Sequence, residues 1–275
     1  MLEKHLELLS PRPASGWRKV ALGTWKTVKD PSVYGVMELP ADRALAYIAA
    51  MQESSGEHIT ISHFVGKALA EALKKHPEIN SVLRWGRLYP RAHVTLFFHA
   101  ATDAQGRDLS GVTISKAEER GLLDIAQEMN RKIASVKDLT DPTYKKMKNL
   151  MQVLPAWLTG FILDLSSVFQ YGFNLWSPLL GTPKDPLGSI QITNIGSLGL
   201  DFAFAPLVPY SRVPLVVAVG AIKDRVIARD GQVVIVPMLR LCVTFDHRLI
   251  DGVHAAKLAK VVEKIFSDPE KELAV

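Results

Sequence analysis

Apolar and polar positions alternate along this chain with two different spacings, one typical of helices and one typical of strands. Helical spacing is found in residues 41–52, 61–76, 115–133 and 253–266. Pro77 is expected to end the second of these helices, because proline cannot continue the hydrogen-bonded ladder. Ser115 and Glu118 have capping-box spacing, which predicts that the third helix begins at Ser115.

Short apolar runs bounded by Gly, Pro and Asp predict strands. These runs are residues 32–39, 93–101, 188–196, 213–222, 225–236 and 238–245. Asp230 and Gly231 lie between two β-branched runs, a strong signal for a hairpin. Because helices and strands mix without strict alternation, we expect one α+β domain over residues 16–275. Residues 1–15 are expected to be a lead-in.

One apolar segment at about residues 141–187 interrupts this domain. Its most apolar part, residues 149–183, carries a single charge at Asp164 and is broken by Pro155. A membrane-spanning helix needs about 20 mostly apolar residues, so this is a poor candidate for one. Three interpretations stay open: a buried helical hairpin, the lining of a channel for a long acyl chain, or contact with a membrane surface.

Composition excludes several classes of protein. The 275 residues carry 33 basic and 28 acidic side chains, and this mild excess, mostly scattered, argues against a nucleic-acid partner. A single cysteine, Cys242, excludes an internal disulfide and predicts no cysteine-based metal site. The first residues do not form a signal peptide, so we expect a cytoplasmic protein, with the option of peripheral membrane contact.

The candidate chemistry lies in residues 242–252, CVTFDHRLIDG, at the end of a predicted strand. An imidazole there can exchange a proton near neutral pH, which makes His247 a candidate general base. Asp251 has the spacing of a helix N-cap, and Asp246 with Arg248 can form an ordinary ion pair. On these residues alone, a structural role for His247 remains open.

A resemblance to a known family changes this balance. HRLIDG is similar to the H-x-x-x-D-G signature of the chloramphenicol acetyltransferase-like superfamily. DHRLIDG resembles the signature of the dihydrolipoyl acyltransferase core of 2-oxo acid dehydrogenase complexes. The segments 61–83 and 189–209 resemble further motifs of that core in the same order. The resemblance implies a mixed sheet flanked by helices, here with a hydrophobic helical insertion.

The resemblance also implies a set of site residues. His247 corresponds to the general base that acts on a thiol, and Thr193 in ITNIG corresponds to the family's hydroxyl residue. Asp251 corresponds to the aspartate that holds the loop, with Arg18 as a candidate partner. The implied substrates are acyl-coenzyme A and dihydrolipoamide. The implied assembly is a homotrimer, or a multiple of trimers, in which the histidine and the hydroxyl come from different subunits. No residues for binding coenzyme A and no metal site are assigned.

The sequence departs from the family in carrying no lipoyl-type lysine hairpin. We therefore expect a lipoyl-bearing protein to act in trans, or a different thiol or hydroxyl acceptor. Two other functions remain as alternatives to acyl transfer. One is a non-catalytic trimeric scaffold, and the other is a membrane-associated homologue that uses residues 149–183.

Overall fold

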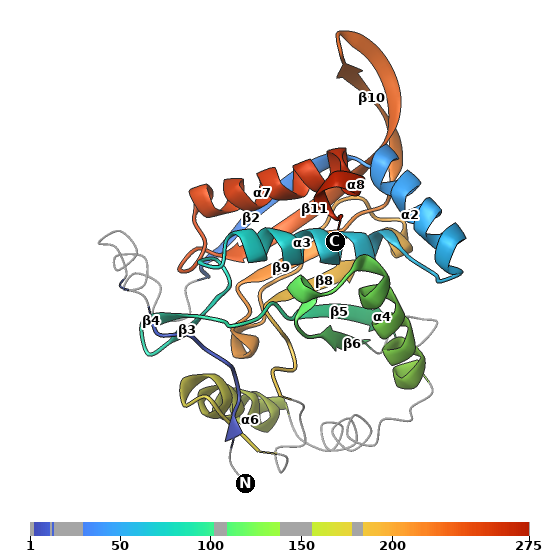
Figure 1. Ribbon diagram of the computed structural model, residues 1–275. Coiled ribbons are helices and arrows are strands. Elements are labelled where there is room, and N and C mark those ends of the chain that lie inside the picture. Colours follow the sequence, from blue (N-terminus) through green and yellow to red (C-terminus); the bar gives the residue numbers. More distant parts are fainter. Residues whose placement is uncertain are drawn as a thin grey trace.

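A seven-stranded mixed sheet forms the centre of the molecule in the computed structural model, which describes residues 3–11, 13, 30–101, 109–137, 156–177 and 184–274. Helices α3 and α7 cover one face of this sheet, and α2 and α4 lie beside them (Figure 1). The strands follow the order β10-β11-β9-β8-β5-β6, with β2 paired to β11. The arrangement is the predicted mixed sheet flanked by helices.

The described elements have the following bounds. The strands are β1 (Glu3–Lys4), β2 (Ser32–Pro40), β3 (Ser81–Arg84), β4 (Arg87–Pro90), β5 (Leu96–Ala101), β6 (Leu109–Ile114), β7 (Leu175–Trp176), β8 (Ile190–Asn194), β9 (Leu215–Val219), β10 (Lys223–Arg229) and β11 (Gln232–Asp246). The α-helices are α2 (Asp42–Ser55), α3 (Ile61–Lys75), α4 (Leu122–Lys137), α6 (Ala156–Ser167), α7 (Gly252–Ser267) and α8 (Pro269–Glu272). Short turns of other helix types are η1 (Ala117–Glu119), η2 (Val168–Gly172), η4 (Gly196–Leu198) and η5 (Pro209–Ser211).

Strand β11 is long enough to pair with three neighbours. Residues 238–246 pair with β2 and residues 241–245 pair with β9, whereas residues 232–238 pair with β10. The β10–β11 hairpin therefore leaves the body of the sheet and projects as an arm (Figure 1). Asp230 and Gly231 at its tip have φ angles of 54° and 77°, the left-handed pair that a tight two-residue hairpin requires.

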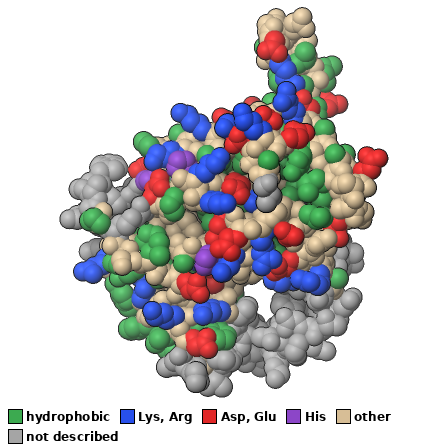
Figure 2. Space-filling view, viewed as in Figure 1, with side chains coloured by type: hydrophobic (Ala, Val, Ile, Leu, Met, Phe, Trp, Pro, Cys, Tyr) green, Lys and Arg blue, Asp and Glu red, His purple; other side chains and the backbone are tan. Residues whose placement is uncertain are grey.

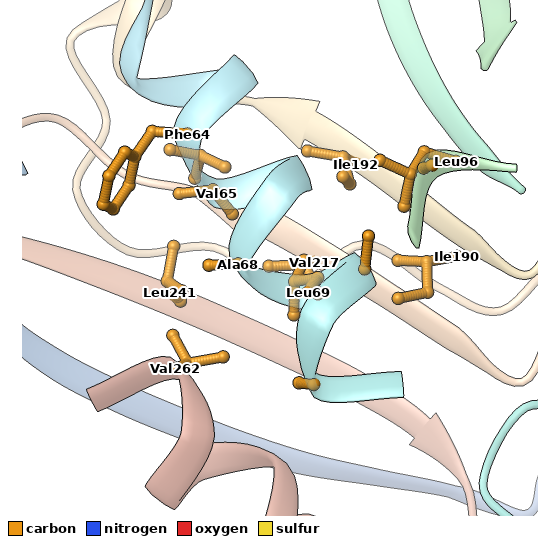
Figure 3. Close-up of a cluster of buried hydrophobic side chains, with 14 of the residues drawn as sticks. Phe64, Val65, Ala68, Leu69, Leu96, Ile190, Ile192, Val217, Leu241 and Val262 are labelled. Carbon is orange, nitrogen blue, oxygen red and sulfur yellow. The ribbon is translucent and has the colours of Figure 1, made fainter. Parts of the chain in front are cut away.

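The core lies between the sheet and its helices. Helix α3 contributes four neighbouring apolar side chains, because positions three and four apart share a helix face. Figure 3 shows this cluster, in which α3 and α7 meet strands of the sheet. Its labelled members are Phe64, Val65, Ala68, Leu69, Leu96, Ile190, Ile192, Val217, Leu241 and Val262. All ten are at most 5% exposed, so the helices are fixed on the sheet mainly by apolar burial.

One predicted helix start is wrong. Residues 117–119 form a short 3₁₀ turn and α4 begins at Leu122, several residues after Ser115. The reason is that the carboxylate of Glu118 accepts a hydrogen bond from the backbone N–H of Val94 at 2.9 Å instead of capping a helix. Asp124 accepts from the N–H of Gly121 at the actual helix start.

The described part of the apolar segment contains one α-helix, α6, followed by a π-helical turn and β7. Strand β7 pairs antiparallel with β1, so this segment is joined to the N-terminal residues (Figure 1). Phe161, Leu165 and Phe173 are exposed, whereas Tyr171 is buried. Among the described helices, none has the length and apolar character needed to cross a membrane.

A buried histidine lies in the first turn of helix α3. His63 is the third residue of the helix and its Nδ1 accepts a hydrogen bond from the backbone N–H of Thr60 at 3.0 Å, which forms a capping box. Burial, together with the smaller effect of nearby His58, lowers the pKa of His63 from 6.5 to about 4. The imidazole is therefore neutral in the folded protein at neutral pH, and protonation would remove the acceptor at Nδ1.

We predict that His63 weakens the fold in acid. Its lowered pKa makes its contribution complete above the ordinary value of 6.5 and lost as the pH falls towards about 4. This shift corresponds to about 3 kcal/mol in the free energy of unfolding. His63→Gln keeps a capping acceptor but does not titrate. Between pH 7 and pH 4 the free energy of unfolding of this variant should therefore fall by about 3 kcal/mol less than that of the wild type. Parallel pH dependences in urea unfolding would contradict this.

Candidate active site

The loop that carries His247 is fixed at both ends. The backbone N–H of His247 donates to the carbonyl of Pro31 at 2.9 Å, directly after β11 ends. The N–H groups of Leu249 and Ile250 both donate to the carbonyl of Asp246, and both of these side chains are buried. The half-buried His247 side chain is thus carried by a short, tightly hydrogen-bonded turn.

Asp246 and Arg248, on either side of the histidine, bind each other. Arg248 Nη2 donates to Asp246 Oδ2 at 2.6 Å and Arg248 Nε donates to Asp246 Oδ1 at 3.0 Å. The same carboxylate accepts from the backbone N–H of Arg248 at 2.9 Å. Because the Asp246 side chain is only 8% exposed, this fork compensates a buried charge and also holds the turn around His247.

Asp251 is the N-cap of helix α7. Its Oδ1 accepts from the backbone N–H of His254 at 3.0 Å and lies 2.9 Å from Nδ1 of the same histidine. The local contacts of Asp251 are therefore those of a helix cap, which is the structural role that its spacing in the sequence allowed. These contacts fix the point at which the loop enters the helix. Arg18, its expected partner, lies outside the described residues.

Thr193 is half-buried near the end of β8, where the chain enters the ITNIG turn. The turn packs tightly on the neighbouring strand, since a Cβ placed on Gly196 would lie 2.6 Å from the carbonyl oxygen of Gly220. Only glycine fits there without a backbone shift. The Asn194 side chain donates to Ser62 Oγ at 2.9 Å and thereby ties the end of β8 to helix α3.

Within one chain the sheet register keeps Thr193 and His247 apart. Thr193 is level with Ala218 of β9, and Ala218 is level with Cys242 of β11. His247 follows Cys242 by five positions, which is about 17 Å along an extended strand, and two strand spacings add about 10 Å sideways. The two side chains therefore lie at opposite ends of the sheet, and one chain does not bring them together.

Arg212 connects the apolar segment to the His247 end of the sheet, and no sequence pattern pointed to it. Arg212 Nε donates to Ser167 Oγ and its Nη1 donates to the carbonyl of Leu83, both at 3.1 Å. Burial lowers the pKa of Arg212, and the charge of Arg248 lowers it further. Arg212 has no motif around it, so only its left-handed backbone (φ 50°) and these distant contacts reveal it.

One cluster of metal-type ligands occurs in the described part of the chain. His93, Glu118 and Glu119 each place a ligand atom within 4.8 Å of the others. Glu118 already accepts from a backbone N–H, and its Oε1 lies 3.1 Å from His93 Nδ1. The cluster thus holds the start of β5 to η1, and it shares no residue with the His247 loop.

Comparison with known families identifies the class of protein. The family model described as "2-oxoacid dehydrogenases acyltransferase (catalytic domain)" matches residues 12–141 and 185–274. These two ranges cover most of the chain, and they leave out residues 142–184, which contain α6. The chain therefore belongs to this family of acyltransferase catalytic domains, as its motifs predicted.

Individual relatives agree with this assignment. The dihydrolipoyllysine-residue acetyltransferase component of the pyruvate dehydrogenase complex of Bacillus subtilis is 24% identical over 217 residues, which are 78% of this chain and 39% of the relative. The chain thus spans well under half the length of that protein. The dihydrolipoamide acetyltransferase structure from Azotobacter vinelandii matches 96% of this chain and 100% of its own at 20% identity and a TM-score of 0.65.

The likeness extends to a more distant structure. A chloramphenicol acetyltransferase matches 92% of this chain and 96% of its own at 14% identity, with a TM-score of 0.50. Together with the sheet and its flanking helices, this confirms the predicted chloramphenicol acetyltransferase-like fold.

We predict that Asp251 contributes to stability mainly as a cap. Asp251→Ala removes the acceptor for the His254 N–H and should lower the free energy of unfolding by about 1 kcal/mol. Asp251→Asn keeps an acceptor and should stay within a few tenths of a kcal/mol of wild type. Urea unfolding at pH 7 measures both. Equal losses in the two variants would show that the negative charge, and not the cap, is what matters.

Proposed function

We propose that this protein is a coenzyme A-dependent acyltransferase in which His247 is the general base. It moves an acyl group between a thioester and an acceptor, which is a dihydrolipoyl group or another thiol or hydroxyl. The observation that carries the proposal is the rigid H-x-x-x-D-G turn of residues 247–252 in a chain of this family. A scaffold has no need for an imidazole held at the end of its central strand.

The chemistry needs a base because a thiol is a poor nucleophile at neutral pH. A free thiol has a pKa of about 8.5, so only a small fraction is thiolate at pH 7. In the proposed reaction His247 takes the thiol proton, and the sulfur adds to the thioester carbonyl. The negative charge that develops on the carbonyl oxygen is stabilised by a hydrogen bond from Thr193. The carbonyl then re-forms as the bond between its carbon and the original sulfur breaks, and the leaving thiolate takes the proton from His247.

The Azotobacter vinelandii relative supports these roles by its spacing. A serine, a histidine and an asparagine were investigated for their part in its catalytic mechanism. The asparagine follows the histidine by four positions, as Asp251 follows His247 here. The serine precedes that histidine by about fifty positions, as Thr193 precedes His247.

A complete site then needs a second copy of the chain. Because Thr193 and His247 lie at opposite ends of one sheet, a single chain supplies two half-sites. A ring in which each chain presents its His247 end to the Thr193 end of the next closes every site. We therefore propose a homotrimer or a multiple of trimers as the active unit.

The projecting arm supplies a surface for such contacts. On one of its faces Val226, Val233 and Ile235 are 66%, 79% and 72% exposed, and the register pairs Val226 directly with Ile235. Charged groups of both signs surround apolar ones on the molecular face that carries the arm (Figure 2). A two-stranded hairpin is marginally stable alone, so we propose that a neighbouring copy of the chain covers these three exposed apolar side chains.

The acceptor side of the reaction involves another partner. The name of the Bacillus subtilis relative includes a dihydrolipoyllysine residue. We therefore propose that a lipoyl-bearing protein delivers the dihydrolipoyl group to the site. Residues 156–177 lie near the His247 end through Arg212, so we propose that they influence which acyl chains or acceptors reach that end.

We predict that activity measurements on variants of the two proposed catalytic residues will distinguish an acyltransferase from a non-catalytic scaffold. His247→Ala should lower kcat for thiol release from acyl-coenzyme A, with dihydrolipoamide as acceptor, by about 10²–10⁴-fold. Thr193→Val should lower it by about 10²–10³-fold, because it removes the donor and keeps the shape. His58→Ala removes an exposed histidine and should leave the rate unchanged.

Wild-type protein without thiol release from several acyl-coenzyme A esters would contradict the proposal. A His247→Ala rate within a few-fold of wild type would contradict the role of this residue and favour the scaffold. Oligomer size measured for each variant separates loss of chemistry from loss of assembly.

A further inference from the structure

Four polar side chains meet where the N-terminal residues, the 156–177 segment and the core come together. The rings of His5 and Tyr171 contact edge to face with centroids 5.0 Å apart. Arg91 Nη1 donates to Asp185 Oδ2 at 2.8 Å. His5, Arg91 and Tyr171 are 0%, 5% and 2% exposed. We call the cavity beside this cluster the Arg91 pocket.

Most of the polar atoms of this cluster lack a partner. Across the described residues, the buried side-chain atoms without a hydrogen-bond partner include both ring nitrogens of His5, Arg91 Nε and Nη2, Tyr171 Oη and Asp185 Oδ1. Each such atom is costly to bury, and native proteins leave few of them unpaired. Six in one cluster indicate a place built to bind a group that supplies the missing partners.

The cluster is held in place by specific contacts. Asn174 binds both backbone groups of Leu6, as Oδ1 accepts from its N–H and Nδ2 donates to its carbonyl at 2.9 Å. The N–H of His5 donates to the carbonyl of Asn174 at 3.0 Å. His5 and Tyr171 lie outside the two ranges that match the acyltransferase family, whereas Arg91 and Asp185 lie inside them, so the cluster joins matched and unmatched parts of the chain.

The pocket itself is small and rimmed by charge. Its cavity has a volume of about 220 Å³, with His5 and Arg91 in its wall. The exposed residues Lys116, Lys184 and Glu7 also line it. Pockets for drug-sized ligands are about 300–1,000 Å³, so this one suits a smaller group. Three of the fixed charges around the cavity are positive, those of Arg91, Lys116 and Lys184. Two are negative, those of Glu7 and Asp185.

The unpaired groups are mostly donors. Burial lowers the pKa of His5 to about 4, so its neutral ring offers one N–H and one acceptor nitrogen. Burial also raises the pKa of Tyr171, which keeps its hydroxyl protonated. Arg91 uses Nη1 for Asp185, and its free edge is the Nε–Nη2 pair, the side that binds carboxylates and phosphates with two parallel hydrogen bonds.

We propose that the Arg91 pocket binds a small oxyanion, the carboxylate or phosphate group of a ligand, on the Nε–Nη2 edge of Arg91. Tyr171 Oη and the N–H of His5 donate to the same group, and Lys116 and Lys184 attract it at the rim. None of the proposed catalytic residues His247, Thr193 and Asp251 lines the pocket, so the inference does not depend on acyl transfer.

The test is calorimetric titration of the full chain with inorganic phosphate and, separately, with succinate, in chloride buffer of constant ionic strength. We expect saturable binding of one anion per chain, and comparison of the two titrations shows whether phosphate or carboxylate is preferred. Arg91→Lys keeps the charge but loses the fork, and should raise Kd about 10–100-fold. Arg229→Lys alters an arginine paired with Asp42 elsewhere and should leave Kd unchanged.

A second variant keeps the test decisive if Arg91→Lys does not fold. Tyr171→Phe removes only the unpaired hydroxyl, so without anion its Tm should equal or exceed that of wild type, while its Kd rises about tenfold. The proposal is wrong if wild type binds neither anion saturably, or if Arg91→Lys binds as tightly as wild type. A lower Tm for anion-free Tyr171→Phe would also overturn it, because the hydroxyl would then already be paired.

Discussion

The hydrogen-bonded register of strand β11 is the constraint on which the other features of the structure depend. Its pairing with β9 sets Cys242 level with Ala218, and the pairing of β9 with β8 sets Ala218 level with Thr193. His247 follows the far end of the same strand. A one-residue shift of register would move every buried side chain of β11 to the other face, so apolar burial opposes such a shift. The separation of the two proposed reactive groups is therefore built into the sheet.

Much of the fold could be predicted from the sequence because the signals are local. Helix α3 has regular apolar spacing and a proline just after its end, and Asp230-Gly231 is a hairpin signal in itself. The motif around His247 is equally local, since a few adjacent residues contain the proposed base, the ion pair and the helix cap. The ordered motifs along the chain then identified the family, which the family match confirms.

What the sequence could not predict depends on contacts between distant residues. Glu118 has capping-box spacing from Ser115, but its carboxylate binds Val94, which lies in a different segment. The His63 cap was missed because histidine is not a usual capping-box residue, although its neutral ring accepts a hydrogen bond. The cluster around Arg91 joins residues more than 160 positions apart in the sequence, and no spacing rule connects His5 to Tyr171.

The central claim is that each active site takes His247 from one chain and Thr193 from another, and mixed oligomers test it most directly. His247→Ala and Thr193→Val chains are each inactive in this account, but co-expressed in equal amounts they form some sites with both wild-type residues. With random mixing in a closed ring, about one quarter of wild-type activity should return. A mixture as inactive as the separate variants, with mixed oligomers verified by mass spectrometry, would contradict the account.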